Sequence, residues 1–132
     1  MALRRLLIDT NAYAAVDRGN IPIIEIFKAT NEIVIPFIVV AELLAGFKHG
    51  LKESRNKAQL GSFLGSHRTD VLYPDKETLE AYAVIFGELR AKGKPIPTND
   101  LWIAALARQH TLPLCTLDAH FAVVDGLEII SV

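Results

Sequence analysis

Four acidic residues in this sequence lie among apolar neighbours. Asp9 and Asp118 each end an uncharged run, and Glu42 and Asp100 are each the one ionisable residue of a long apolar stretch. Burying an ionised carboxylate without a partner costs several kcal/mol. No lysine or arginine nearby in the sequence supplies a partner. Each of the four therefore requires a cation, hydrogen-bond donors or a raised pKa.

Four carboxylates that share one pocket repel one another, and one or two bound divalent cations relieve this repulsion. Oxygen ligands without cysteine or paired histidine favour Mg²⁺ or Mn²⁺ over zinc. Such a site activates water and stabilises the leaving oxygen of a phosphodiester. Neutral hydrogen-bonding neighbours that would support the site are Thr10, Asn11, Asn99 and Thr116.

Each carboxylate also has a purely structural interpretation. Asp9 is a good N-cap for a following helix, and Asp100 is another, although Thr98 is available to cap the same helix instead. Asp118 is a typical turn residue. Glu42, inside a helical segment, cannot cap and would have to pair with a distant arginine. A purely structural explanation requires four independent roles, one for each carboxylate. We therefore favour the interpretation that the four carboxylates converge on one site.

Short apolar strands alternate with helical segments, a pattern typical of an α/β fold with a parallel sheet covered by helices. The expected strands are Leu6–Ile8, Ile33–Ile35, Val71–Tyr73, Leu112–Leu117 and Leu127–Ile130. The expected helices are Ala12–Asp17, Ile23–Thr30, Phe37–Phe47, Lys52–Leu64, Lys76–Lys92 and Asn99–His110, with Asp75 as a cap and Gly93 as a stop.

This order of elements would gather the four acidic residues. In a parallel sheet, the carboxyl ends of the strands and the first turns of the helices that follow lie along one edge. Asp9 and Asp118 follow strands directly, Asp100 begins a helix, and Glu42 lies about two turns into another.

Composition indicates a single domain over residues 1–132 with a well-filled core, since 51% of the residues are hydrophobic. The apolar segments are too short or too interrupted for a secretory signal or a membrane span, so we expect no membrane association. One cysteine, Cys115, cannot form an internal disulfide, and we expect a cytoplasmic protein. The net charge of −1 excludes a strong overall attraction to nucleic acid, so any such binding would have to use local basic patches.

Four ordered motifs resemble the PIN-domain ribonucleases, in particular the VapC-like toxins of bacterial and archaeal toxin–antitoxin pairs. They are "LLIDTNAY", "PFIVVAELLAG", "PTNDLWIAALA" and "LCTLDAHF", and together they span essentially the whole chain. The resemblance implies a PIN-like three-layer fold, a five-stranded parallel sheet with helices on both faces. It also implies Mg²⁺- or Mn²⁺-dependent endoribonuclease activity, a homodimer and inhibition by a cognate VapB-like antitoxin.

The resemblance further implies that Asp9, Glu42, Asp100 and Asp118 are the catalytic and metal-binding residues. Two alternatives remain: a catalytically idle PIN-like binding module and a housekeeping RNA-processing nuclease. A phosphatase or receiver protein is disfavoured, because "DTN" lacks the second aspartate of the common phosphatase motif.

A basic cluster follows the helix of Glu42, and its candidate RNA-binding members are Lys48, Lys52 and Arg55. The same charges would also suit a solvated helix face. His120 lies two residues after Asp118 and could border the site, although a capping or surface role is more common for such a residue.

Overall fold

A parallel sheet of five strands forms the centre of the molecule. The computed structural model describes residues 3–131. The strands are β1 (Leu3–Ile8), β2 (Thr30–Pro36), β3 (Thr69–Leu72), β4 (Leu114–Cys115) and β5 (Ile129–Ile130), and their order in the sheet is β3-β2-β1-β4-β5. All neighbouring strands pair in parallel. The expected α/β class with a five-stranded parallel sheet is confirmed.

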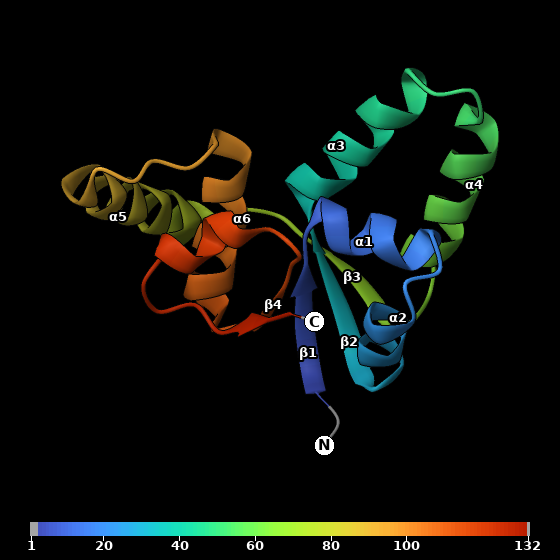
Figure 1. Cartoon of the computed structure of the whole chain (residues 1–132), viewed down its shortest axis with the longest axis horizontal. Helices are drawn as coiled ribbons and strands as arrows, with labels where there is room; N and C mark the ends of the chain where they lie inside the picture. Colours follow the sequence, from blue (N-terminus) through green and yellow to red (C-terminus); the bar gives the residue numbers. More distant parts are fainter. Residues whose placement is uncertain (1–2, 132) are drawn as a thin grey trace.

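Helices cover both faces of this sheet (Figure 1). They are α1 (Thr10–Asp17), α2 (Ile21–Lys28), α3 (Phe37–Lys48), α4 (Glu53–Leu64), α5 (Lys76–Lys92) and α6 (Thr98–His110). A 3-10 helix, η1 (Ala119–Val123), connects β4 to β5. The chain runs outward through β1, β2 and β3 and then returns to β4 on the other side of β1. Because parallel crossovers are right-handed, α1–α4 lie on one face and α5 and α6 on the other.

The core lies on both faces of β1 and around α6. Leu6, Leu7 and Ile8 at the end of β1 are fully buried. In α6, Leu101 and the run 103–107 are also buried, so this helix is enclosed nearly all round its circumference. A strand and a helix buried to this degree are rigid supports for the polar residues at their ends.

Local signals set both ends of α5 where the sequence predicted them. Asp75 accepts a hydrogen bond from the backbone N–H of Thr78, and Thr78 accepts one from the backbone N–H of Asp75, which forms a capping box. Gly93 ends the helix with φ of 69°, a left-handed conformation that glycine adopts without strain. The expected bounds of this helix are reproduced.

The start of α6 differs from the expectation. No side chain caps this helix: its N-cap is Pro97, and Thr98 is already its first helical residue. Asp100 therefore lies in the first turn without serving as the cap. The carboxylate is left free for contacts outside the helix.

Strands β4 and β5 are shorter than the predicted ranges Leu112–Leu117 and Leu127–Ile130. Pro113 has no N–H to donate to a ladder. At the other end, the backbone N–H of Thr116 reaches Ile130 O only at 3.3 Å. Thr30, predicted to end a helix, instead begins β2. No helix among residues 3–131 is long and apolar enough to cross a membrane.

Candidate active site

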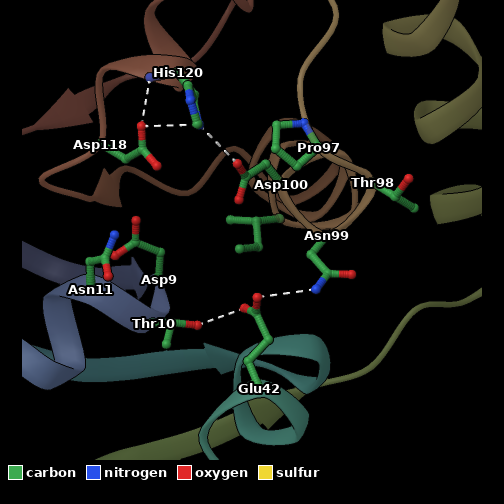
Figure 2. A pocket seen from close by; sticks show the side chains of 11 residues that line it. Asp9, Thr10, Asn11, Glu42, Pro97, Thr98, Asn99, Asp100, Asp118 and His120 are labelled. Carbon is green, nitrogen blue, oxygen red and sulfur yellow. Dashed lines mark hydrogen bonds and ion pairs between the residues drawn. The ribbon is translucent and has the colours of Figure 1, made fainter. Parts of the chain in front are cut away.

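A pocket of about 500 Å³ opens at the carboxyl ends of β1 and β4 (Figure 2). The chain leaves β1 toward one face of the sheet and leaves β4 toward the other, so a crevice forms between them. All four acidic residues of the predicted set line the pocket. The lining comprises Asp9, Thr10, Asn11, Glu42, Pro97, Thr98, Asn99, Asp100, Ile103, Asp118 and His120.

Asp9 is the most deeply placed of the four carboxylates. It follows β1 directly and is only 4% exposed. Its Oδ1 accepts a hydrogen bond from the backbone N–H of Ala12 at 2.8 Å, and its Oδ2 accepts one from the hydroxyl of Thr116. Asp9 therefore caps α1 and lines the pocket at the same time.

Glu42 is held by two neutral donors rather than by an arginine. The hydroxyl of Thr10 donates to Glu42 Oε1 at 2.7 Å, and Asn99 Nδ2 donates to Oε2 at 3.1 Å. These donors come from the first turns of α1 and α6, whereas Glu42 lies in α3. Three helices from distant parts of the sequence thus meet at one carboxylate.

Asp100, Asp118 and His120 form the tightest polar group in the pocket. The Nδ1 atom of His120 lies 3.3 Å from Asp100 Oδ2 and 3.1 Å from Asp118 Oδ1. The backbone N–H of His120 donates to Asp118 Oδ1 at 2.9 Å, and that of Asp118 donates to the hydroxyl of Thr116. Among residues 3–131, this is the one group of at least three acidic, histidine or cysteine side chains whose ligand atoms lie within 4.8 Å of one another.

Burial and mutual repulsion govern the acid–base properties of the pocket. Burial raises the pKa of Asp9 above its ordinary value, whereas hydrogen bonds from Thr116 and Ala12 lower it. Burial also raises the pKa of Asp100, opposed by the hydrogen bond from His120 and reinforced by the charge of Asp118. Both shifts show that negative charge is costly here when no cation is present.

The predicted supporting residues occupy two different positions. Thr10, Asn11 and Asn99 line the pocket. Thr116 is buried beneath it and links Asp9 to the backbone of Asp118. The neutral groups thus orient carboxylates, as a shell of supporting hydrogen bonds does around a metal site.

The candidate RNA-binding residues lie outside the pocket. Lys48 ends α3, Lys52 precedes α4 and Arg55 lies within α4, and all three are exposed. Lys48 is also paired with Glu53 at 3.4 Å. Lys48 lies six residues after Glu42 in α3, which corresponds to about 9 Å along the helix axis.

Sequence reasoning gave too little weight to His120 and omitted Pro97, Thr98 and Ile103 from the pocket. His120 is more than a surface residue, because its ring contacts two of the predicted carboxylates. Its position two residues after Asp118 was the available signal. The other three line the pocket only because α6 begins at its rim, and no residue type identifies that from the sequence.

The donor atoms of the pocket suit a hard divalent cation. Carboxylate and amide oxygens predominate, with one imidazole and no thiol, since Cys115 is fully buried in β4. This set matches the oxygen-rich ligation of Mg²⁺ or Mn²⁺ and lacks the cysteine and paired histidine of a zinc site. The residues present therefore fit a magnesium-type or manganese-type ion.

Comparison with known proteins identifies the family. The PIN domain profile matches residues 6–127. Ribonuclease VapC4 of Mycobacterium tuberculosis is 26% identical, and the match covers all of both chains. Ribonuclease VapC5 of the same organism is 27% identical over 91% of this chain and 87% of its own.

Two solved toxin–antitoxin complexes contain a chain with the same fold. DNA-bound VapBC from Salmonella typhimurium aligns with a TM-score of 0.87 at 27% identity, covering 98% of each chain. VapBC2 from Rickettsia felis, bound to a promoter fragment, aligns with a TM-score of 0.86 at 25% identity, covering 97% of this chain and 98% of its own. With its sheet order, its acidic pocket and a profile match over nearly its whole length, this chain belongs to the PIN domain family.

Proposed function

We propose that this chain is a metal-dependent endoribonuclease and the toxin of a VapBC-type pair. The observation that carries the proposal is the pocket in which four carboxylates from separate elements meet, in a chain of the PIN family. Curated relatives along the full chain are named ribonucleases. We also propose that the protein acts in the cytoplasm, where RNA substrates are present.

Asp9, Glu42, Asp100 and Asp118 would hold one or two Mg²⁺ or Mn²⁺ ions. A bound ion would supply an activated water and stabilise charge on the phosphodiester. The chain's own residues fix the carboxylates in place: Thr10 restrains Glu42, and a hydroxyl beneath the pocket restrains Asp9. The pocket volume of about 500 Å³ lies in the range of small-molecule sites. A phosphodiester with its adjoining sugars is a group of this size.

Lys48, Lys52 and Arg55 are proposed to contact the RNA backbone. Lys48 ends the helix that carries Glu42, and Lys52 and Arg55 follow it around the α3–α4 turn, so a strand whose phosphate occupies the pocket could extend toward them. Contacts of this kind hold RNA of any sequence and weaken with salt.

The proposed partner is a VapB-like antitoxin, and the proposed assembly is a homodimer. Structural neighbours over nearly the full chain are VapBC complexes, some of them bound to DNA. Large apolar side chains exposed on α5, namely Leu79, Val84 and Phe86, are candidates for a protein interface. A small neighbouring gene that encodes a DNA-binding protein would support this biological role.

A cleavage assay tests the proposed activity. Purified protein should cut a labelled RNA when Mg²⁺ or Mn²⁺ is present, EDTA should stop the reaction, and excess metal should restore it. Cleavage that persists after removal of all divalent metal would refute the metal-dependent mechanism.

Calorimetry separates this proposal from an idle binding module. A nuclease site should bind Mn²⁺ in the absence of RNA, and Asp9→Asn should weaken that binding. A folded protein that shows no binding of either metal would leave the binding module as the better explanation.

A further inference from the structure

The imidazole of His120 lies between two carboxylates rather than against one. Its Nδ1 is 3.1 Å from Asp118 Oδ1 and 3.3 Å from Asp100 Oδ2, and Figure 2 shows the ring between these two side chains. The backbone N–H of His120 also donates to Asp118 Oδ1, which fixes the start of η1. The ring is therefore held at the rim of the pocket by its own chain.

Nδ1 can link the two carboxylates either through a proton or through a metal ion. Nδ1 carries at most one proton, which it donates to one carboxylate or shares between both in a bifurcated hydrogen bond. Asp118 Oδ1 already accepts the backbone N–H of His120. When Nδ1 is unprotonated, its lone pair and the two carboxylate oxygens are close enough together to share one divalent cation.

The separations match those between neighbouring ligands of a divalent ion. Ligand atoms about 2.1 Å from a cation at right angles to one another lie about 3.0 Å apart. The two distances from Nδ1 are close to this value. The side chain of His120 is 53% exposed, whereas those of Asp100 and Asp118 are 19% and 25% exposed, so the ring can adjust while the carboxylates stay fixed.

We propose that His120 Nδ1 is a direct ligand of the divalent ion, together with Asp100 and Asp118, and that this nitrogen makes the site prefer Mn²⁺ over Mg²⁺. Mg²⁺ is bound almost wholly through oxygen, whereas Mn²⁺, a transition-metal ion, loses less than Mg²⁺ does when a nitrogen replaces one oxygen ligand. The inference rests on the proposed metal-dependent function, to which it adds a ligand and a metal preference.

Spectroscopy of Mn²⁺-loaded protein tests the ligand directly. Electron spin echo measurements should detect a directly bound nitrogen in the wild-type protein and in His67→Ala, a control histidine exposed before β3. The signal should be lost in His120→Ala and in His120→Asn, which places an oxygen near the position of Nδ1. Calorimetry should show about tenfold weaker Mn²⁺ binding in His120→Ala and a smaller change in Mg²⁺ binding.

His120→Asn serves as the conservative variant. It should recover part of the Mn²⁺ affinity while the Mn²⁺-over-Mg²⁺ preference stays reduced. Mn²⁺ bound to the wild-type protein without a nitrogen signal would overturn the role of His120 and leave the nuclease proposal standing. Absence of any Mn²⁺ or Mg²⁺ binding would overturn both.

Discussion

Asp9 shows how one residue supports both the fold and the site. One of its oxygens caps α1 through the N–H of Ala12, and the other accepts the hydroxyl of Thr116 at the base of the pocket. Capping and catalysis therefore need not compete. The helix cap holds the carboxylate in position, and burial makes its charge costly unless a cation is bound.

We expect Asp9→Asn to stabilise the metal-free protein at neutral pH by on the order of 1 kcal/mol. The folded-state pKa of Asp9 is raised above 3.8 by burial, so the folded protein holds this proton more tightly than the unfolded chain does. Its contribution to stability is complete below the unfolded-state pKa and is lost as pH rises through the raised folded-state pKa. Asparagine keeps an oxygen that can accept the Ala12 N–H.

Urea unfolding in EDTA checks this prediction. The stability advantage of Asp9→Asn should grow as pH rises above the unfolded-state pKa of about 4 and should level off above the raised folded-state pKa. Asp70→Asn, at an exposed position of β3, should show no such trend. An advantage for Asp9→Asn that is the same across this range would contradict the assigned cause.

At the residue scale, the sequence predicted which carboxylates meet and four polar residues around them, but not the contacts of His120 with two of the carboxylates. Glu42 and Asp100 were conspicuous because a charge among apolar residues is costly, and this signal is local. The contact between His120 and Asp100 joins η1 to α6 and depends on how β4 places the turn. Their roles in catalysis and metal binding stay predictions.

At the scale of elements, α5 and α6 are joined by a small polar network. The buried hydroxyl of Thr78 accepts the N–H of Asp75 and donates to Gln109 in α6, whose amide donates to Asp75. The hydrogen bond from Gln109, followed by that from the backbone N–H of Thr78, lowers the pKa of Asp75. The network fixes the start of α5 against the helix that carries Asp100.

We expect Thr78→Val to destabilise the protein by about 1–3 kcal/mol, because it leaves the partners of a buried hydroxyl unsatisfied. The rate of RNA cleavage per folded molecule should stay within about twofold of wild type, since the network lies outside the pocket. Chemical denaturation and a cleavage assay on the folded fraction measure the two effects. Unchanged stability would show that the network contributes nothing.

The accuracy of the predicted elements followed the strength of local signals. The bounds of α5 were predicted because a cap and a left-handed glycine mark its two ends. The start of α6 was predicted one residue too late, and no side chain caps it, because Pro97 occupies the N-cap. The short ladder of β4 depends on pairing with β1 and β5, which is a tertiary property absent from any local pattern.

At the scale of the whole molecule, opposite charges occupy separate regions. The chain has a net charge of −1, yet the pocket gathers four carboxylates while Lys48, Lys52 and Arg55 lie exposed around the α3–α4 turn. Figure 1 shows this turn at the end of α3 away from the sheet. Lys48 is also paired with Glu53 in this region, and RNA binding by the three basic residues stays a prediction. The single domain over residues 1–132 stays a prediction.

We expect alanine at Lys48, Lys52 and Arg55 together to raise the KM for RNA roughly tenfold and to flatten its dependence on salt, because fewer counterions are released on binding. The value of kcat should change little. A control variant with alanine at Arg4, Lys28 and Lys76 removes equal charge elsewhere and should leave KM nearly unchanged. Equal effects of the two variants would assign the change to net charge alone.

RNA cleavage by Asp100→Asn is the most direct test of the central claim that the pocket carboxylates and a divalent ion together cut RNA. Asp70→Asn is the matched control, because it removes one exposed acid from β3 and leaves the pocket intact. With saturating Mn²⁺, the wild-type protein and Asp70→Asn should cleave a labelled RNA at similar rates. Asp100→Asn should be at least about a hundredfold slower while still folded. Cleavage by folded Asp100→Asn at the wild-type rate would contradict the account.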